Sequence, residues 1–443
     1  MNVRTFLRVL GFVYFIAFTS FGMQAAGLIG SHGILPFADY LKAARDAVGS
    51  AAYWDLPSVL WLRPTDAFLA AVWMAGAACA LAAVCTRWPR AALASCLVLW
   101  LSLCSVGQDF LSFQWDMLLL ETGFLAVFAD SSRVRVWLFR WLLFRLMFFS
   151  GAVKLLSHDA AWRNLTALRY HYETQPLPTP LAWYMHQLPA ALQKASTVFV
   201  FLVELVVPFL FFAPRRLRHA GAYLSIALQV LIFLTGNYTY FNILAVALTM
   251  FLFIECDKTP GRFHSAASIL LAAFIGVVSG LLFFELFSVA PPPGGYRLLR
   301  AVAPLRIVNS YGLFAVMTTT RPEIIVEGSN DGDRWLAFEF PYKPGDVRRA
   351  PPIVEPLQPR LDWQMWFAAL GNYQEDPWFV NFMIRLLQGE PTVLRLLRYN
   401  PFPHGPPKYI RARLYLYHFT HWGDRAWWSR EESGAYFPTV SLK

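Results

Sequence analysis

The sequence predicts a polytopic α-helical membrane protein with a C-terminal soluble α+β domain built on β-hairpins. Of its 443 residues, 57% are hydrophobic and only 15% are charged, whereas about 25% of the residues in soluble domains are charged. The charges are also unevenly spread. Residues 1–296 contain 20 Lys/Arg and 14 Asp/Glu, and the last 147 residues contain 18 and 14. These observations exclude a disordered chain, a coiled coil and an ordinary cytosolic enzyme.

We therefore expect three parts: a multi-span transmembrane region over residues 1–290, a Pro/Gly linker at 291–296 and an exported α+β domain over 297–443. A membrane-crossing helix needs about 20 largely apolar residues. Three stretches are shorter or carry polar residues, at 110–128, 141–156 and 241–256. Six fit more clearly, at 6–28, 67–84, 91–105, 198–213, 220–235 and 265–288. The number of spans lies between six and nine, and nine is the best model.

The placement of basic residues favours nine spans with a cytoplasmic N-terminus. Short cytoplasmic loops are rich in Lys and Arg, and the short turns near residue 108 and at 237–240 contain neither. This arrangement places the C-terminal domain on the non-cytoplasmic side. It also accounts for most of the net charge of +10, so no nucleic-acid partner is expected. The basic residues assigned to the inside are Arg4, Arg8, Arg87, Arg90, Arg133, Arg135, Arg140, Arg215, Arg216, Arg218, Lys258 and Arg262.

The exported region contains signals for both strands and helices. Residues 323–327 and 335–340 flank a Gly/Asn/Asp-rich turn, as in a β-hairpin. A further strand is predicted at 409–420. Short helices are predicted at 362–370, 377–387 and 392–397, with Asp376 as a cap before Pro377.

The strand at 409–420 presents two unlike faces. One face carries Ile410, Ala412, Leu414 and Leu416, and the other carries arginines and tyrosines that are either solvated or form a contact surface. The domain is also rich in tryptophan. Most of these side chains should lie in the core, and a subset exposed together would bind a client protein. The candidate client-binding residues are Trp363, Trp366, Arg411, Arg413, Tyr415 and Tyr417.

Several long strings spread over the chain resemble the lipase maturation factor family. They are SFQWDMLLLETGF (112–124), LRYHYETQPLP (168–178), WYMH (183–186), NYTYFN (237–242), SYGLF (310–314), VEGS (326–329), PRLDWQMWF (359–367) and NPFP (400–403). The resemblance implies a multi-span membrane protein that assists the folding and assembly of secreted dimeric lipases. In animal members this takes place in the endoplasmic reticulum, where the C-terminal domain faces the lumen.

The chain ends soon after residue 438, without the longer tail associated with animal members. We therefore expect a compact, bacterial version as one alternative, whose membrane is the bacterial inner membrane. The expected partners are a secreted client protein, such as a lipase, and the lipid bilayer.

Polar residues within the predicted spans define a further hypothesis, because such residues are costly in a bilayer and usually functional. In one interpretation, Arg145 or Lys154 pairs with Asp116 or Glu121 and fixes the helix register. Lys154 could equally extend its amine to the interface. The residues at membrane depth are Asp109, Gln114, Asp116, Glu121, Arg145, Lys154 and Glu204, with Glu285 near the end of the last span.

An alternative function is a membrane-embedded enzyme. The string SGAVKL (150–155) is similar to a run in the vitamin K-dependent carboxylase family, whose lysine acts as a base, and only Lys154 would inherit that role. His171, Glu173 and His186 could act as proton-transfer partners. A transporter is the third class, although no paired inverted repeat is visible. No Cys-x-x-Cys or His-x-x-x-His spacing is present, so no metal or cofactor is expected.

Overall fold

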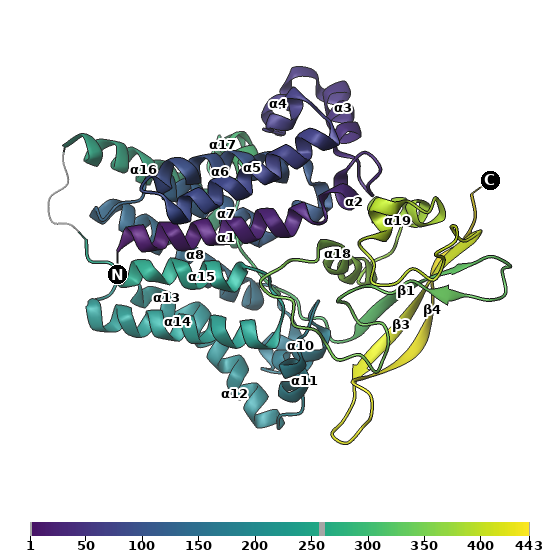
Figure 1. Cartoon of the computed structure of the whole chain (residues 1–443). Coiled ribbons are helices and arrows are strands. Elements are labelled where there is room, and N and C mark those ends of the chain that lie inside the picture. The colour runs from purple at the N-terminus through teal and green to yellow at the C-terminus, as the bar shows by residue number, and fades with distance from the viewer. Residues whose placement is uncertain (1, 257–261, 443) are drawn as a thin grey trace.

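The computed structural model describes residues 2–256 and 262–442, as a helical bundle joined at one end to a domain with a β-sheet (Figure 1). Lys258 therefore lies outside the described residues. Among the residues described, seven helices are long and apolar enough to cross a membrane. They are α1 (Val3–Gly22), α5 (Asp66–Cys85), α6 (Pro89–Val106), α8 (Arg133–Leu156), α12 (Ala190–Phe201) continued by α13 (Val207–Leu210), α14 (Arg215–Thr235) and α16 (Arg262–Leu286). The polytopic α-helical class is confirmed.

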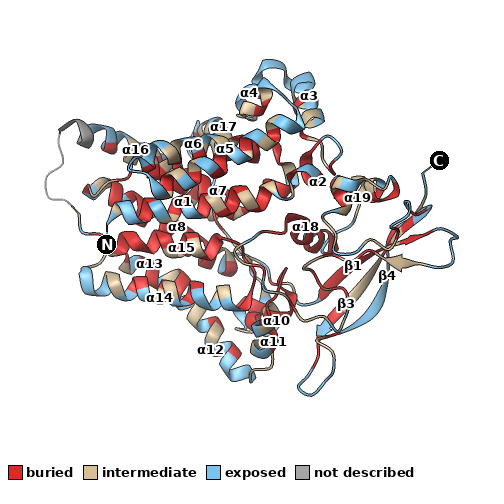
Figure 2. Ribbon diagram, in the orientation of Figure 1, coloured by how far each residue is buried: buried red, intermediate tan, exposed pale blue. Residues whose placement is uncertain are grey.

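Two shorter helices run through the interior of the bundle. They are α7 (Gln114–Val127) and α15 (Phe241–Thr249), the latter extended by one 3₁₀ turn to Leu252. Both are mostly buried by the surrounding helices (Figure 2). The seven long helices found among the described residues fall within the predicted range of six to nine spans, and α7 and α15 coincide with two of the three predicted stretches that are shorter or carry polar residues. Their shortness reflects their position, since a helix enclosed by protein does not have to span the full bilayer.

Local sequence signals set the ends of several of these helices. The Thr65 side chain caps α5 by accepting a hydrogen bond from the Phe68 N–H. Pro89 occupies the first turn of α6, where its missing N–H costs nothing. Between α12 and α13, residues Leu202–Val206 form one π-helical turn, which ends two residues before Pro208. Such turns are rare and often mark functional sites.

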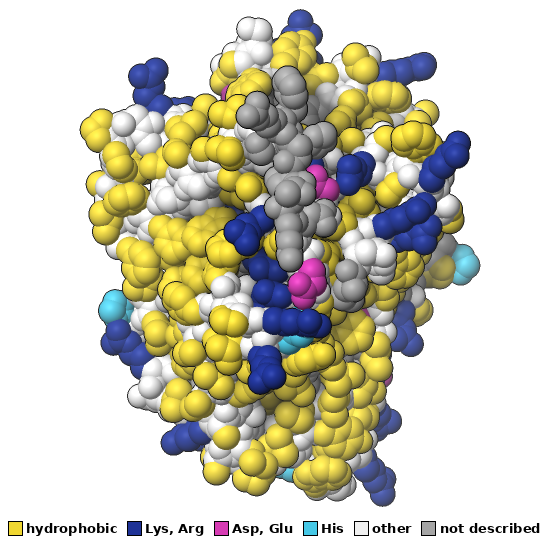
Figure 3. Space-filling model, turned by 90° about the vertical axis from the view of Figure 1, so that its left-hand side faces the viewer, with side chains coloured by type: hydrophobic (Ala, Val, Ile, Leu, Met, Phe, Trp, Pro, Cys, Tyr) yellow, Lys and Arg dark blue, Asp and Glu magenta, His cyan; other side chains and the backbone are white. Residues whose placement is uncertain are grey.

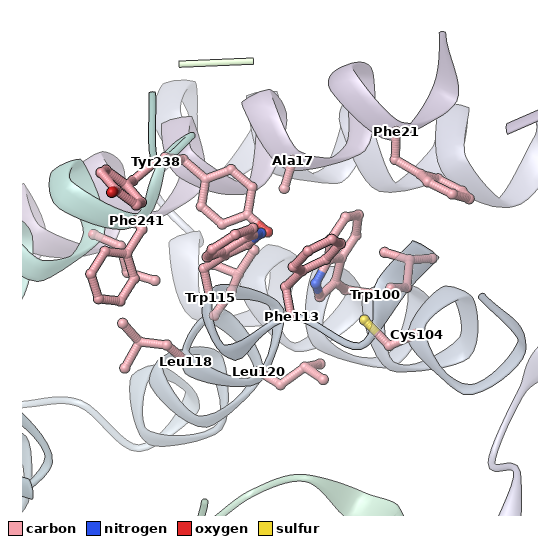
Figure 4. Close-up of a cluster of buried hydrophobic side chains, with 14 of the residues drawn as sticks. Ala17, Phe21, Trp100, Cys104, Phe113, Trp115, Leu118, Leu120, Tyr238 and Phe241 are labelled. Atoms are coloured by element: carbon pink, nitrogen blue, oxygen red, sulfur yellow. The ribbon is translucent and has the colours of Figure 1, made fainter. Parts of the chain in front are cut away.

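Aromatic side chains from α1, α6 and the start of α7 lie in one buried cluster (Figure 4). Phe113 and Trp115 stack with a ring separation of 4.7 Å, and Trp100 of α6 packs edge-on against Phe18 and Phe21 of α1. Aromatic pairs of this kind contribute stability beyond the area that they bury. The buried core continues from these residues into the sheet domain.

The two ends of the bundle differ in character. The N-terminus and the α5–α6 connection lie at the left-hand end in Figure 1. Viewed from that side, Lys and Arg predominate among the charged side chains (Figure 3). Short helices gather towards the opposite end. They are α2 (Ala25–Ile29), α3 (Phe37–Val48), α4 (Ala52–Asp55), α9 (Ala160–Arg163), α10 (Ala167–Thr174) and α11 (Pro180–His186). Of these, α3 and α4 lie at the top of the bundle away from the sheet, and the others lie nearer to it (Figure 1).

The last span is followed by α17 (Gly295–Val302), and the chain then returns to the bundle before the sheet begins. The sheet is antiparallel, with strand order β2-β1-β3-β4. Its strands are β1 (Arg321–Ser329), β2 (Leu336–Ala337), β3 (Tyr409–Phe419) and β4 (Trp428–Val440), and its helices are α18 (Arg360–Ala369), α19 (Pro377–Leu387) and α20 (Pro391–Leu394). The predicted α+β domain is confirmed.

Details of this domain differ from expectation. The β1–β2 hairpin pairs Glu327 with Ala337, and α19 has the predicted limits. The carboxylate of Asp376 accepts a hydrogen bond from the Trp378 ring nitrogen at 3.2 Å and makes no capping bond. Strand β4 was not predicted, because its exposed polar residues 429–434 lack an alternating apolar pattern.

The two faces of β3 are buried at opposite ends of the strand. Ile410 and Ala412 are buried in the same core as α18 and α19, as the pattern predicts. Tyr417 and Phe419, from the other face, are also buried, against α10 and α11. The assignment of Tyr417 to an exposed contact face is therefore wrong. One end of β3 therefore packs in the core of the sheet domain, and the other end packs against the short helices α10 and α11 of the membrane region.

Candidate functional site

The junction between the bundle and the sheet domain contains most of the polar residues that the sequence places at membrane depth. Residues 307–317 run through it without regular structure, between α7, α8 and α10. The Gln114 side-chain oxygen accepts a hydrogen bond from the Gly312 N–H at 2.9 Å, and its amide donates to the Gly312 carbonyl at 3.3 Å. The Ser157 hydroxyl donates to the Ala315 carbonyl at 2.6 Å. Irregular backbone is stable at this depth because protein encloses it.

Asp116 of α7 is fully buried and binds the sheet domain. Its carboxylate oxygens each lie 2.9 Å from a guanidinium nitrogen of Arg360, on α18. The Tyr240 hydroxyl donates to the same carboxylate at 2.7 Å. A planar, two-point contact of this kind is both strong and geometrically specific. Asp116 therefore joins the membrane region to the sheet domain and forms no ion pair within the described part of the bundle.

Glu121 of α7 lies at the centre of a second buried network. It forms an ion pair with Arg145 of α8, as one interpretation of the sequence predicts. Its other oxygen accepts hydrogen bonds from the Asn309 N–H at 2.9 Å and from the Tyr311 hydroxyl at 2.7 Å. Arg145 also donates to the Asn309 carbonyl at 2.8 Å. Both charges are thus satisfied only with the participation of the segment that follows the last span.

Further contacts fix the junction around Asn237. Its side-chain oxygen accepts from the Val354 N–H at 2.7 Å, and its amide donates to the Pro352 carbonyl at 2.9 Å. The Glu355 carboxyl accepts a hydrogen bond from the Tyr238 N–H, and burial raises the pKa of Glu355 to about 9. Glu355 is therefore neutral at pH 7.

Asp109 lies in the 3₁₀ turn before α7, at the outer edge of the junction. Its backbone carbonyl accepts a hydrogen bond from the Gln364 side chain. Burial raises the pKa of its carboxyl, and the nearby Asp376 adds to that shift. Asp109 thus contributes to docking mainly through its backbone.

The four candidate catalytic residues do not form one centre. Glu173 faces the sheet, where its carboxylate accepts from the Phe419 N–H at 2.7 Å, and His186 lies 3.8 Å from that carboxylate. Lys154 and His171 instead line a cavity within the bundle. Burial and the charge of Lys154 lower the pKa of His171 to about 4, so its imidazole is neutral. The structure therefore separates the predicted proton-transfer set into a pair that supports the sheet and a pair that faces the cavity.

Lys154 forms a buried ion pair with Glu204, at 2.8 Å. Its amine also donates to the Ser150 carbonyl at 2.9 Å and lies 5.2 Å from the centre of the Trp162 ring. Glu204 belongs to the π-helical turn. Helix α8 and this π-helical turn approach closely at Gly151, where a Cβ atom would lie 2.9 Å from the Cβ of Glu204. Lys154 thus remains inside the bundle, and the alternative that it extends to the interface is wrong.

An outward cleft of about 780 Å³ lies between α18 and residues 312–318. Trp363 and Trp366 contribute to its walls, although only 3% and 6% of their surfaces are exposed. The Trp366 ring nitrogen donates to the Thr174 carbonyl at 2.9 Å. The expectation that these two tryptophans form an exposed patch is therefore wrong. The exposed apolar side chains of the cleft are Val316, Phe367 and Leu370.

The arginines of β3 are engaged by neighbouring strands. Arg411 lies 2.8 Å from the Glu327 carboxylate and 3.9 Å from the centre of the Trp335 ring. Arg413 pairs with Glu432. Tyr415 lies 4.8 Å below the guanidinium of Arg430. These cross-strand pairs stabilise the sheet, and Arg411, Arg413 and Tyr415 remain partly accessible.

Sequence reasoning missed the residues that complete the junction. Arg360, Asn309, Tyr311, Asn237 and Glu355 all bind across it. Four of the five lie in or next to the strings that carry the family resemblance, at 237–242, 310–314 and 359–367. That clustering was the one available signal. Within residues 2–256 and 262–442, no group of three or more His, Cys, Asp or Glu could hold a metal ion.

These features define a class: a multi-pass membrane protein with an α+β domain that is fixed to the end of its helical bundle by buried ion pairs. The family model of the lipase maturation factor transmembrane domain matches residues 1–258, and that of the lipase maturation factor C-terminal domain matches residues 307–438. The chain belongs to the lipase maturation factor family.

Individual relatives align over nearly the whole chain. It is 37% identical to lipase maturation factor 2 of Homo sapiens, over 99% of this chain and 82% of the relative. It is 33% identical to lipase maturation factor 1 of Bos taurus, over 98% of this chain and 88% of the relative. No solved structure matches.

Proposed function

We propose that this protein is a membrane-anchored maturation factor that helps a secreted, lipase-like hydrolase to fold and assemble. The observation that carries the proposal is membership of a family whose members are named for lipase maturation. The architecture supports it, because the buried junction holds an α+β domain in a fixed position at one end of the bundle. A client that emerges from the same membrane would meet this domain at a defined distance from the bilayer.

The outward cleft is the proposed client site. Its rim exposes Val316, Phe367 and Leu370 around two largely buried tryptophans. An apolar cleft of this size suits an apolar segment of a chain that has not completed folding. The accessible parts of Arg411, Arg413 and Tyr415 offer a second, polar contact. Binding of this kind requires no chemical step, so the proposed role is non-enzymatic.

The proposed location is a membrane of the secretory route, with the cleft on the non-cytoplasmic side. The concentration of arginines at the opposite end of the bundle supports this orientation. By family, the membrane is that of the endoplasmic reticulum, and in a bacterial cell it would be the inner membrane.

Co-expression with a secreted lipase tests the proposal. In cells that lack their own maturation factor, the wild-type chain should raise the specific activity of the secreted lipase. The double variant Phe367→Ser/Leu370→Ser should reduce that gain several-fold, because it makes the cleft rim polar. Ile353→Ser is the matched control, since Ile353 is exposed in the same domain but does not line the cleft. Equal activity for the cleft variant and the control would contradict the proposed site.

One observation favours the alternative of a membrane-embedded enzyme, namely that Lys154 and His171 both line the cavity in the bundle. The variant Lys154→Arg separates the two functions, because arginine keeps the positive charge beside Glu204 but cannot act as a base. A maturation factor should retain its activity in this variant. Complete loss of activity in a normally folded variant would favour the enzyme.

A further inference from the structure

A cavity of about 500 Å³ lies within the bundle, between α8, α12 and α14 and below α10 and α11. Its walls are mainly leucine, methionine and phenylalanine side chains from these helices. A volume in this range is typical of small-molecule sites, which combine apolar walls with a few polar groups. The proposed client cleft lies beyond Leu313 and Phe314, which contribute to the walls of both spaces. The cavity is thus a second space, distinct from the client cleft.

The cavity opens sideways, between two membrane-spanning helices. Leu192 of α12 and Leu231 and Leu234 of α14 all line it, yet 53%, 47% and 46% of their surfaces are exposed. Side chains that border a cavity and also reach the outer surface mark its mouth. Because both helices belong to membrane spans, this mouth faces acyl chains. A ligand would therefore arrive from the bilayer.

The ion pair of Lys154 and Glu204 gives the cavity a polar end. Two of the three N–H groups of Lys154 are used, by Ser150 and by Glu204 Oε2. Among the described residues, the second oxygen of Glu204 makes no hydrogen bond. One donor and one acceptor thus remain available side by side. The neutral imidazole of His171 lies near this end, 3.3 Å from the Tyr238 hydroxyl.

The charge balance of this end selects the class of ligand. The lysine and the glutamate neutralise each other, so a neutral head group can bind without leaving a net charge in the membrane. A carboxylate or phosphate would lie close to the carboxylate of Glu204, and like charges repel strongly where the dielectric constant is low. A hydroxyl or ester group, in contrast, can donate to Glu204 and accept from Lys154.

We propose that this cavity binds a neutral single-chain lipid, of the monoacylglycerol class, with its chain along the apolar walls and its hydroxyl or ester group at the Lys154–Glu204 pair. The π-helical turn and the close approach at Gly151 hold the two charges in position for this contact. The binding site is separate from the client cleft and does not depend on the proposed maturation role.

Photolabelling of the purified full-length protein tests the proposal. The probe is a monoacylglycerol with a diazirine within its chain and a terminal alkyne, added to protein in lipid nanodiscs. We expect labelled peptides from α12 and α14, and at least a five-fold decrease when unlabelled monoacylglycerol is in excess. A fatty acid and a phosphatidylcholine with the same diazirine chain should label these peptides at least five-fold less. Equal labelling by either lipid would overturn the assignment of a neutral single-chain ligand.

Variants on one helix provide the matched comparison. Ala195 lines the cavity and is also exposed, so Ala195→Trp narrows the mouth and should reduce labelling at least five-fold, whereas Val198→Trp, exposed on the same helix outside the cavity lining, should leave it unchanged. The double variant Lys154→Met/Glu204→Leu removes the polar end and should also reduce labelling. Ser196→Phe replaces Ala195→Trp if that protein does not fold. Equal labelling of folded cavity variants and of Val198→Trp would overturn the site.

Discussion

Arg360 and Asp116 form a two-point ion pair at 2.9 Å although 244 residues separate them in the chain. Asp116 lies in the membrane bundle and Arg360 in the sheet domain, and both side chains are almost completely buried. Neither charge has water available to replace its partner. Through this pair, the stability of the bundle depends on the sheet domain being in its fixed position.

Removal of one partner should be strongly destabilising. We expect Arg360→Met to lower the free energy of unfolding by about 3–5 kcal/mol, because the Asp116 charge is left buried and unpaired. The double variant Asp116→Leu/Arg360→Met should lose less than Arg360→Met alone. Chemical unfolding in mixed micelles gives both values. The control is Arg215→Met, whose exposed partner Glu255 lies at 3.6 Å and whose loss should cost no more than about 1 kcal/mol. Equal losses for Arg360→Met and the control would contradict this account.

The hydroxyl of Tyr311 should contribute measurably to the Glu121 network. Tyr311→Phe removes a 2.7 Å hydrogen bond to a buried carboxylate, and we expect a loss of about 1.5–3 kcal/mol in the free energy of unfolding. Tyr296→Phe, at an exposed tyrosine of α17, should change it by less than about 0.5 kcal/mol. A Tyr311→Phe protein as stable as wild type would show that the other partners of Glu121 suffice.

The raised pKa of Glu355 makes stability depend on pH. Its pKa rises from 4.5 to about 9 on folding, so the folded state binds the proton more tightly than the unfolded state. The contribution to stability is fully present below pH 4.5 and decreases as the pH rises towards 9, by at most about 1.4 kcal/mol per unit. Glu355→Gln should remove this dependence. When the free energy of unfolding is measured at pH 6, 7 and 8, the stability of Glu355→Gln relative to wild type should increase with each step. If the two proteins show the same dependence on pH, Glu355 does not have this role.

The topology predicts which loops an impermeant thiol reagent can reach. In a background without native cysteines, Asp333→Cys in the β1–β2 turn should react in intact cells, or in sealed vesicles with the sheet domain outside. Arg216→Cys, at the start of α14, should react only after the membrane is permeabilised. Labelling in the reverse order would place the exported domain in the cytoplasm.

The local elements of this fold could be predicted from sequence. The hairpin of β1 and β2 follows from its turn residues, and α19 follows from the spacing of its apolar residues after Pro377. The β4 strand could not be predicted in this way, because its central residues are polar and exposed. β4 forms because it pairs with β3 in the antiparallel sheet, and an apolar pattern of its own is not required.

The candidate site was harder to predict, because its contacts join distant parts of the chain. The sequence identified Asp116 and Glu121 as charges that need partners, and it named Arg145 correctly. It could not identify Arg360 or Tyr311, since no local pattern shows which arginine or tyrosine will approach a given helix. The same reason explains the burial of Trp363, which packs against Trp115, and of Trp366, which donates to Thr174, 192 residues earlier in the chain.

The dependence of α7 on later residues has a consequence for biogenesis. When α7 leaves the ribosome, Asn309 is still 188 residues away and Arg360 is 244 residues away. At about 5–20 residues per second, translation takes roughly 10–50 seconds to supply these partners. During that time the Asp116 carboxylate has no cationic partner, and one oxygen of Glu121 has no hydrogen-bond donor. Charged groups in this state are costly in a bilayer. We therefore expect the insertion machinery to hold α7 in a hydrated or protected state until the sheet domain, which is translated later, supplies the missing partners.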